Sequence, residues 1–524
     1  MAVKTKPTHQ RELFGHPVGL YVLFMTEMWE RFSYYGMRAL LVIYMTAKTL
    51  DLDPQSGLGW TGTEALALYG WYTMLVYVMS IPGGLIADRL IGQKWSVGIG
   101  AILLTMGHGV LAIDAMWAFY TGLGLIILGV GLLKPNISTM VGGLYKANDI
   151  RRDKGFSIYY IGINLGSFLA SLSVGLVAKE YGWHWGFGLA GIGMFFGLIV
   201  YLIGQYYFLP HVGNSPTVEE KTEDISLGSL FSQLLKSPLQ LGIVVLLLIL
   251  SVYAGFTFTG PDNWGYGVLF IFLSLITGMM MMIYKNLNGQ VEKDRYVVLL
   301  LSLLIVMAFW GCFEQMGGLM NLYAEEKTNR MLLGWEVPTA WFQGANAGFI
   351  LLFSVGVANF WAKRKLKGKQ ASSLFKMATG MIIMGVGFIY MVFASMQYES
   401  EGSSAMYWLV LAYLFHTLGE LSLSPVSMSF FTKLAPARYM ALMMGVYWAA
   451  TGLGNKVAGV IGESSVKAGD QKVFGGLVIF AVLFGILVML LLKPLQRLTH
   501  GAEDNETEIK EEDNKGPELA ERAN

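Results

Sequence analysis

Six charged or phenolic side chains lie close together in an apolar segment near the start of the chain, between about residues 18 and 45. They are Glu27, Glu30, Arg31, Tyr34, Tyr35 and Arg38. Because an α-helix turns about 100° per residue, four of them share one face and the other two flank it. Charged groups at membrane depth cost about 2.5–3.5 kcal/mol each and usually face a bundle interior or a water-filled path. The stripe therefore predicts a transport pathway. A structural Glu–Arg lock between helices is the alternative, and both roles can coexist.

Two cations in the first half of the chain are matched by two acids in the second half. Lys134 precedes Pro135 inside an apolar segment, where a lysine needs a partner unless it snorkels toward a helix end. Arg38, Glu314 and Glu420 also lie within apolar segments. Ion pairs across the halves would neutralise all four charges and could act as a switch. The alternative is that each charge finds a partner within its own half.

The loop after the second apolar segment is rich in glycine and charge, from Gly83 to Lys94. Small glycines allow a neighbouring helix to approach closely. Asp88 can cap a helix end or pair with a basic group, forming a lock that breaks as two halves rock. We therefore predict a gate at Asp88 and Arg89, with an ordinary tight loop and surface ion pair as the alternative.

Composition places the chain in the membrane. It has 524 residues, 54% hydrophobic and 14% charged, whereas a soluble protein carries about 25% charge. The net charge of +1 gives no indication of nucleic-acid binding. Cys312 is the single cysteine, so there is no intrachain disulfide, and no Cys/His spacing predicts a metal site. The polar start of the chain lacks the apolar core of a cleaved signal, so we expect the first span to direct insertion.

Apolar stretches of about 20 residues predict fourteen transmembrane helices. We place them near 18–47, 64–87, 94–113, 117–142, 156–178, 184–208, 238–258, 266–285, 296–322, 338–362, 372–396, 405–431, 440–462 and 472–493. This pattern of six, two and six predicts an all-α polytopic membrane protein with four parts. They are an N-terminal six-helix bundle (1–210), a linker with two inserted helices (211–290), a C-terminal six-helix bundle (291–497) and a charged tail (498–524).

Basic clusters in the loops predict the orientation. They occur at Arg89 to Lys94, Arg151 to Lys154, Lys363 to Lys369 and Lys433 to Arg438, all on one side when fourteen spans are counted. The positive-inside rule assigns that side to the cytoplasm. We therefore expect a multi-pass protein of the inner (cytoplasmic) membrane with both termini in the cytoplasm.

The inserted pair and the buried histidines offer no catalytic chemistry. Neither 238–258 nor 266–285 has an ionisable residue in its middle, so we expect both helices outside the transport core. The methionine run Met279 to Met282 indicates packing or lipid contact rather than a metal site. His108 and His416 lie far apart in sequence, and we interpret each as a hydrogen-bonded packing residue. The chain is therefore not predicted to be an enzyme.

Several motifs together resemble the proton-dependent oligopeptide transporters, a branch of the major facilitator superfamily. They are Glu27-x-x-Glu30-Arg31-Phe32-x-Tyr34-Tyr35-Gly36, the loop Gly83 to Lys94, Gly131 to Ser138, Phe156 to Ser167, Phe309 to Gly317, Trp341 to Asn346 and Leu418 to Pro425. The resemblance covers nearly the whole chain. It implies the major facilitator fold, two six-helix bundles plus two inserted helices.

The resemblance also implies roles for individual residues. It assigns proton coupling to Glu27, Glu30, Arg31 and Glu314. It also implies that Arg38 and Glu314 form an outer gate pair. Lys134 and Glu420 are expected opposite each other across the cavity. Substrate contacts fall to Tyr34, Tyr35, Arg38, Tyr77, Lys134, Asn164, Trp310, Asn346, Glu420, Tyr447 and Thr451. Asn164 could instead serve only as contact between helices.

Two features depart from the family pattern. Many bacterial members have tryptophan where this chain has Tyr447, with Trp448 next to it, so the shape of the pocket is open. Lys456 is an extra basic residue in the same helix, and a snorkelling side chain is one interpretation.

The resemblance implies proton-coupled symport of di- and tripeptides by alternating access. A zwitterionic peptide has a carboxylate for Arg38 and Lys134 and an ammonium for Glu420. The proton is the coupling ion, and we expect no cofactor or metal. We expect the protein to work as a monomer in the bilayer. Alternatives are a proton-coupled transporter of nitrate or another small metabolite, a drug–proton exchanger, and, in another class, a non-transporting receptor or scaffold.

Overall fold

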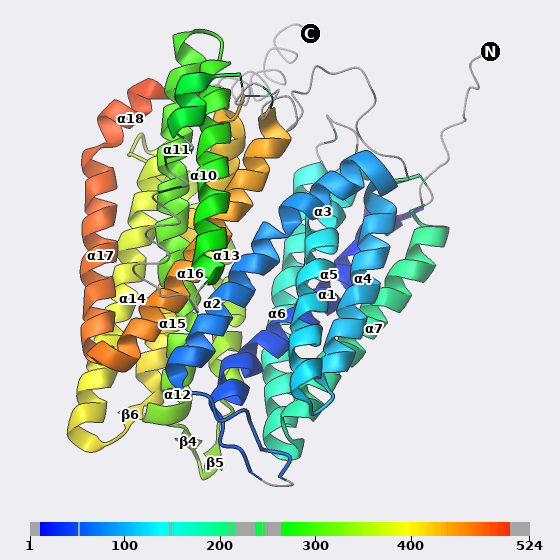
Figure 1. Ribbon diagram of the computed structural model, residues 1–524, viewed down its shortest axis with the longest axis vertical. Helices are drawn as coiled ribbons and strands as arrows, with labels where there is room; N and C mark the ends of the chain where they lie inside the picture. Colours follow the sequence, from blue (N-terminus) through cyan, green and yellow to red (C-terminus); the bar gives the residue numbers. More distant parts are fainter. Residues whose placement is uncertain are drawn as a thin grey trace, which may run out of the picture. The chain divides into compact units, whose positions relative to one another are not determined.

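Long α-helices make up most of the chain (Figure 1). The computed structural model describes residues 11–50, 53–145, 149, 151–209, 211–214, 232, 236–243, 245–246, 249, 264–436 and 439–502. The helices are α1 (Val18–Thr46), α2 (Gly62–Val78), α3 (Ser80–Ile86), α4 (Gly92–Leu111), α5 (Met116–Gly143), α6 (Arg152–Tyr181), α7 (Trp183–Tyr207), α10 (Trp264–Lys285), α11 (Gly289–Phe313), α12 (Leu319–Lys327), α13 (Ala340–Leu366), α14 (Ser373–Glu401), α15 (Met406–Leu434), α16 (Met440–Ala468), α17 (Asp470–Leu490) and α18 (Leu492–Leu498). Most predicted spans agree with these bounds within a few residues.

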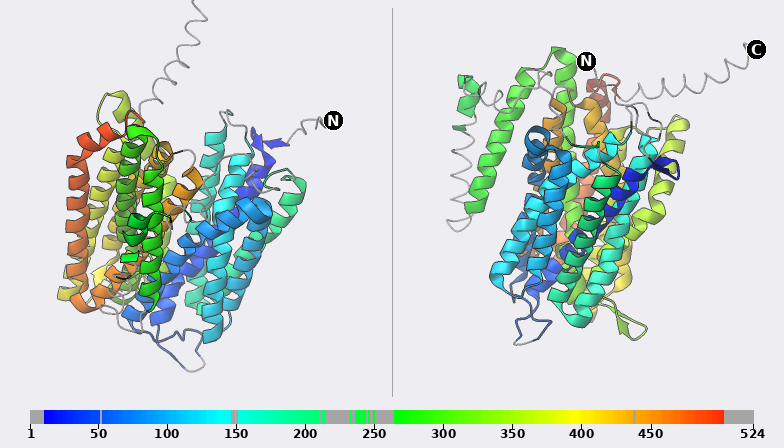
Figure 2. Two further views of the ribbon diagram at one scale, coloured as in Figure 1. Left: turned by 45° about the horizontal axis from the view of Figure 1, so that its top comes forward. Right: turned by 90° about the vertical axis from the view of Figure 1, so that its right-hand side faces the viewer.

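Short elements connect the helices. A π-helical turn, η1 (Ala87–Ile91), follows α3, and a 3-10 turn, η3 (Glu314–Met316), separates α11 from α12. Six two-residue strands form three pairs: β1 (Glu12–Leu13) with β2 (His16–Pro17), β3 (Thr328–Asn329) with β6 (Ser404–Ala405), and β4 (Met331–Leu332) with β5 (Trp335–Glu336). The β4–β5 hairpin projects beyond the helices in Figure 1 and in the right-hand view of Figure 2.

The ends of some helices are set by local sequence. Thr61 and Glu64 form a capping box at the start of α2, where the Thr61 hydroxyl accepts from the Glu64 amide at 3.3 Å. The Glu64 carboxylate accepts from the Thr61 amide at 2.9 Å. Helix α14 ends at Gly402, which has a φ of +77°. Pro135 and Pro425 lie inside α5 and α15, where each removes one backbone donor.

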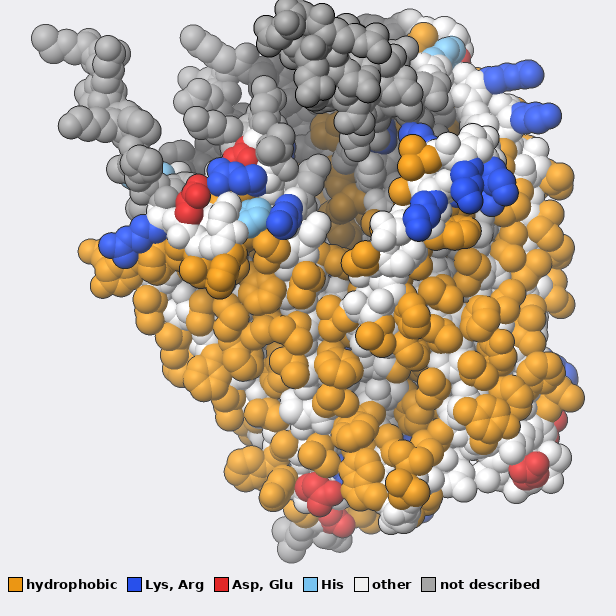
Figure 3. Space-filling view, turned by 180° about the vertical axis from the view of Figure 1, so that it is seen from behind, with side chains coloured by type: hydrophobic (Ala, Val, Ile, Leu, Met, Phe, Trp, Pro, Cys, Tyr) orange, Lys and Arg blue, Asp and Glu red, His pale blue; other side chains and the backbone are white. Residues whose placement is uncertain are grey.

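Exposed apolar side chains indicate which surfaces face lipid. Nine helices within the described residues are long and apolar enough to cross a membrane. Helix α1 is as long as these, but it carries the predicted charged stripe. Figure 3 shows a broad band of hydrophobic side chains below an end where Lys and Arg side chains gather. Such a band is what a bilayer requires of a polytopic protein.

The chain separates into two compact units. The larger comprises Met1–Glu219, Leu303–Ser429 and Gly445–Leu492. Within it α4 packs along α5, α14 along α17, α1 along α6 and α7, and α6 along α13. In Figure 1 helices α4, α5 and α7 lie on one side of this unit, and α14 and α17 lie on the other.

The smaller unit comprises Glu220–Ser302, Phe430–Met444 and Lys493–Asn524. Within it the Tyr296 hydroxyl donates to the Met280 carbonyl at 3.1 Å, and Arg295 Nε donates to the Thr499 carbonyl at 2.9 Å. Met280 and Met282 are buried, consistent with a packing role for the methionine run. Helix α10 matches the second inserted helix, whereas most of 238–258 lies outside the described residues. The predicted four-part division of the chain stays a prediction.

Helices α3 and α5 come so close that only glycine fits between them. A Cβ atom on Gly83 would lie 1.9 Å from the Gly131 carbonyl oxygen, far below any real contact. Asn136 Nδ2 donates to the carbonyls of Leu132 and Gly83, which ties the two helices together. The close contact keeps the end of the α2–α3 span against α5, the helix that carries Lys134.

We predict that Gly83→Ala destabilises the protein by about 1–3 kcal/mol, because the added methyl group overpacks a backbone contact. The measurement is the apparent Tm of the purified protein in detergent. The control is Gly124→Ala on α5, where a Cβ would meet nothing within 4 Å. Equal Tm values for the two variants would contradict the assignment of a tight α3–α5 contact.

Candidate functional site

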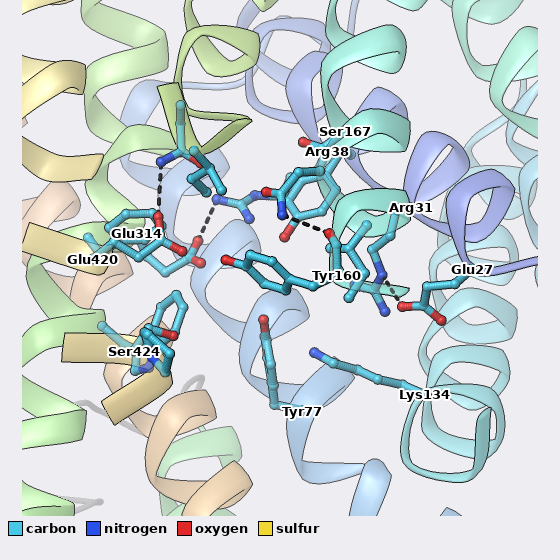
Figure 4. Close-up of a pocket in the computed structure, with 18 of the residues that line it drawn as sticks. Glu27, Arg31, Arg38, Tyr77, Lys134, Tyr160, Ser167, Glu314, Glu420 and Ser424 are labelled. Carbon is cyan, nitrogen blue, oxygen red and sulfur yellow. Dashed lines mark hydrogen bonds and ion pairs between the residues drawn. The ribbon is translucent and has the colours of Figure 1, made fainter. Parts of the chain in front are cut away.

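A cavity of about 460 Å³ lies inside the larger unit and collects most of the predicted site residues (Figure 4). Its wall comes from helices of both halves of the chain. The predicted residues that line it are Glu27, Arg31, Tyr35, Arg38, Tyr77, Lys134, Asn164, Trp310, Glu314, Asn346, Glu420 and Tyr447. Charged, amide and aromatic groups therefore surround one space of the size that small-molecule sites have.

Arg31 holds two carboxylates on α1. Its Nε lies 2.8 Å from Glu27 Oε1, one helical turn earlier, and 2.6 Å from Glu30 Oε2. All three side chains are at most 5% exposed. Glu30 Oε1 has no hydrogen-bond partner among the described residues. Two acids thus share one cation in a buried position.

Arg38 joins the two halves of the chain. One terminal nitrogen lies 2.7 Å from Glu314 Oε2, and its Nε donates to the Tyr69 hydroxyl at 2.8 Å. The Tyr69 hydroxyl in turn donates to Glu314 Oε2 at 3.1 Å, which closes a triangle. A Cβ on Gly317 would lie 1.9 Å from the Tyr69 hydroxyl oxygen, so glycine is required beside the triangle. This cluster is buried and pairs charges across the halves.

A break in the predicted span 296–322 presents Glu314 to Arg38. Helix α11 ends at Phe313, η3 follows, and α12 starts at Leu319. The Tyr413 hydroxyl donates to the Met316 carbonyl at 3.0 Å, and Gln315 Nε2 donates to carbonyls of α11 and α16 at 3.1 Å. These bonds satisfy backbone groups that the break releases, as a buried helix interruption requires.

Lys134 and Glu420 lie on opposite sides of the cavity, as Figure 4 shows. Asn346 Nδ2 donates to Glu420 Oε2 and to the Thr417 hydroxyl, both at 3.0 Å. The Lys134 ammonium lies 3.7 Å from the Tyr77 ring centroid and 4.9 Å from the Trp448 ring centroid. Within the described part of the chain no carboxylate lies within 4.0 Å of this ammonium. Lys134 is therefore held by two rings rather than paired with an acid.

Some predicted site residues lie outside the cavity wall. Glu30 and Tyr34 are buried on α1 beside residues that do line it. The Thr451 hydroxyl donates to the Tyr447 carbonyl at 3.3 Å, so it faces its own helix. Asp88 lies in η1, away from the residues that form the wall, and the side chain of Arg89 lies outside the described residues.

Helical spacing could have found cavity residues that the motifs missed. Tyr160, Ser167 and Ser171 line the wall with Asn164, at intervals of four, three and four residues along α6. Ser424 follows Glu420 by one turn in the same way. The motifs indicate Trp448 only as the neighbour of Tyr447, and no local pattern in the sequence predicts that it reaches Lys134.

Two interpretations of buried residues need correction. Lys456 does not snorkel: its side chain is 4% exposed, its ammonium lies 3.5 Å from Glu463 Oε1, and the Trp71 ring lies 4.6 Å away. His108 and His416 are packed as expected, with both fully buried. Neither imidazole has a hydrogen-bond partner among the described residues, so they are packing residues without the expected hydrogen bonds. His416 packs against the Phe388 ring, with centroids 4.4 Å apart.

We predict that Tyr69→Phe destabilises the protein by about 1–3 kcal/mol, because it leaves buried charged groups of Arg38 and Glu314 short of a partner. The change should appear as a lower apparent Tm. Tyr72→Phe on the same helix is the matched control, since the buried Tyr72 hydroxyl has no partner among the described residues. If Tyr72→Phe costs as much as Tyr69→Phe, the triangle does not contribute to stability.

This chain is similar to known proteins over most of its length. The family model described as the POT family matches residues 94–475. The peptide transporter YePEPT of Yersinia enterocolitica is 36% identical over 97% of this chain and 100% of its own length. A di-/tripeptide transporter of Lactococcus lactis is 34% identical over 93% of this chain and 98% of its own.

Solved structures show the same fold. A peptide transporter POT in complex with sulfate is 35% identical, with a TM-score of 0.80, over 93% of this chain and 97% of its own. A POT family transporter in complex with 5-aminolevulinic acid is 31% identical, with a TM-score of 0.77, over 93% of this chain and 98% of its own. These likenesses confirm the predicted fold class and the predicted resemblance. The chain is a multi-pass membrane transporter rather than an enzyme, and it belongs to the POT family.

Proposed function

We propose that this protein is a proton-coupled symporter that moves di- and tripeptides into the cell by alternating access. The observation that carries the proposal is the placement of Glu420 and Lys134 on opposite sides of one cavity (Figure 4). A free peptide carries an ammonium at one end and a carboxylate at the other, and charge-assisted hydrogen bonds make both ends good anchors. Relatives named as peptide and di-/tripeptide transporters support the same substrate class.

Lys134 is the anchor for the carboxylate of the peptide. Arg38, the other candidate cation, already bonds to Glu314 and Tyr69. Among the described residues the Lys134 ammonium contacts the rings of Tyr77 and Trp448, and such contacts leave its hydrogen-bond donors open to an anion. Glu420, positioned by Asn346, receives the ammonium of the peptide. The complex of a related transporter with 5-aminolevulinic acid fits this scheme, because that ligand also joins an amine to a carboxyl group.

The remaining wall suits the rest of a peptide. Hydroxyl and amide groups of Tyr160, Asn164 and Ser167 offer hydrogen bonds to the peptide unit. Trp310 and Tyr447 offer apolar surface to variable side chains, so contacts there place few demands on their identity. A cavity of about 460 Å³ is large enough for a small peptide with some water.

Buried ion pairs on α1 and η3 supply the coupling to protons. A proton on Glu27 or Glu30 weakens the hold on Arg31, and a proton on Glu314 weakens the pair with Arg38. Removing one charge from a buried pair changes its free energy by several kcal/mol, enough to bias a two-state element. Each proton that enters down a potential of 100 mV supplies about 2.3 kcal/mol.

Several contacts between the halves lie on the side that we assign to the exterior. The Arg38–Glu314 pair is one of them. Near the β4–β5 hairpin, Lys179 Nζ lies 3.2 Å from Glu336 Oε2, and Trp341 Nε1 donates to the Leu172 carbonyl at 3.0 Å. These contacts describe a state closed to the outside, and they must part when the site opens outward.

The orientation follows from loop charge. The basic ends of the helices face the cytoplasm, with both termini on that side, in the inner membrane. Exposed apolar surface on α4, α7 and α17 meets lipid, and the protein works as a monomer.

An anion such as nitrate is the second candidate substrate. The sulfate bound in a related structure favours it, as does the lack of a carboxylate within 4.0 Å of the Lys134 ammonium in the described part of the chain. Glu420 in the same cavity opposes it, because a small anion gains nothing from a carboxylate. A non-transporting receptor would bind peptide without accumulating it.

We predict that the purified protein in liposomes accumulates a labelled dipeptide only with an inward proton gradient, and that a protonophore abolishes accumulation. Glu420→Gln should lower uptake about tenfold or more, because it removes a charge-assisted bond. The control is Glu180→Gln, which alters an exposed carboxylate on α6. Uptake of nitrate without uptake of the dipeptide would show that the substrate is a small anion rather than a peptide. Gradient-driven dipeptide uptake that is unchanged in Glu420→Gln would refute the site.

We predict a second effect from the rings around Lys134. Trp448→Leu should weaken binding of a dipeptide with a free carboxylate about 3- to 30-fold, because one cation–π contact that positions the ammonium is lost. Binding of the C-terminally amidated dipeptide should not change, and Trp448→Phe should retain most of the affinity. Equal losses for the free and amidated dipeptides would show that Trp448 contacts the peptide elsewhere.

A further inference from the structure

A second pocket, of about 370 Å³, lies between α13, α14 and α15 and shares no lining residue with the central cavity. Its wall is almost entirely apolar and includes Phe353, Gly356, Phe360, Trp361, Phe375 and Ile383. Phe353 and Phe360 are 39% and 57% exposed, so the pocket opens at a surface of the unit. Transport through the central cavity makes no use of it.

The few polar groups in this wall are already bonded within the protein. The Thr379 hydroxyl donates to the Phe375 carbonyl at 2.8 Å, and the Ser422 hydroxyl donates to the Leu418 carbonyl at 2.9 Å. Trp361 Nε1 donates to Ser422 Oγ at 3.3 Å. The interior of the pocket therefore suits a hydrocarbon chain and has little to offer a polar solute.

Basic side chains lie at the rim. The Arg364 guanidinium lies 5.2 Å from the Phe375 ring centroid, and the Lys376 ammonium lies 5.9 Å from the Trp361 ring centroid. Between Ala340 and Met396 the sequence contains six basic residues and no acidic one. They are Lys363, Arg364, Lys365, Lys367, Lys369 and Lys376. The apolar pocket thus ends at a strongly positive surface, where a bilayer places its headgroups.

We propose that this pocket binds one acyl chain of an anionic phospholipid from the surrounding bilayer, with the lipid phosphate at Arg364 and Lys376. An acyl chain gains free energy for each methylene group that it buries, and the phosphate gains from two adjacent cations. Gly356 makes room for the chain, because a Cβ there would meet nothing within 4 Å. A lipid bound in this way connects the C-terminal end of α13 to the N-terminal end of α14. The inference is independent of the substrate.

The test uses the full-length protein in detergent after its lipids have been washed out. Phosphatidylglycerol or phosphatidylcholine with the same acyl chains is titrated in, and native mass spectrometry counts the lipids retained. We expect one tightly retained phosphatidylglycerol. The double variant Arg364→Gln/Lys376→Gln should weaken its binding about 30-fold, by loss of two cations near the headgroup. Gly356→Leu should abolish retention of either lipid, because its side chain fills the pocket.

The matched control is Lys493→Gln/Arg497→Gln, which removes one Lys and one Arg from exposed positions of α18. It should retain phosphatidylglycerol like the unaltered protein. Equal binding of both lipids to the unaltered protein, or equal losses in the two double variants, would overturn the headgroup assignment. Retention by a folded Gly356→Leu variant would overturn the pocket, and no retained lipid at all would overturn the whole proposal.

Discussion

A charge inside a membrane-spanning bundle must be paired or must face water, and this constraint organises the core of the protein. Helix α1 carries two arginines within two turns, and each meets the constraint differently. Arg31 is neutralised by acids of its own helix, whereas Arg38 reaches Glu314 in the other half of the chain. The arrangement around Arg31 places two carboxylates on the same helix as the cation, whereas the Arg38–Glu314 pair joins the two halves of the chain. In the proposed alternating access, relative motion of the halves would separate Arg38 from Glu314, whereas the partners of Arg31 lie on its own helix.

Irregular backbone occurs where the site needs it. The α11–α12 span is interrupted at Glu314, α5 contains Pro135 directly after Lys134, and α15 contains Pro425 after Glu420. Each interruption releases backbone groups that a lipid-facing helix could not leave unpaired. Tyr413 and Gln315 satisfy some of these groups around η3. These interruptions lie next to charged residues of the cavity wall.

The two proposed anchors of the peptide, Glu420 and Lys134, differ in how firmly they are held. Glu420 has hydrogen-bond support from Asn346, while the Lys134 ammonium rests on the rings of Tyr77 and Trp448. Tyr77 and Trp448 come from opposite halves and stack with their centroids 5.9 Å apart. The position of Lys134 therefore depends on how the halves meet at that point. A cation held by such contacts adjusts to ligands more readily than one held in an ion pair.

The sequence by itself determined the class of the protein, most of its helices and twelve of the twenty-six residues of the cavity wall. Apolar length and helical spacing are local properties, so they could place Glu27, Arg31 and Arg38 on one helix face. Family motifs placed Asn346 and Glu420 in the same cavity. The family resemblance also implies the Arg38–Glu314 pair, which the structure contains. Only the tertiary structure decided that Tyr69 joins this pair and that Lys134 lies against two rings in place of an acid. The contacts of Tyr69 with Arg38 and of Lys134 with Tyr77 and Trp448 depend on distances between helices, which residue spacing within one helix does not contain.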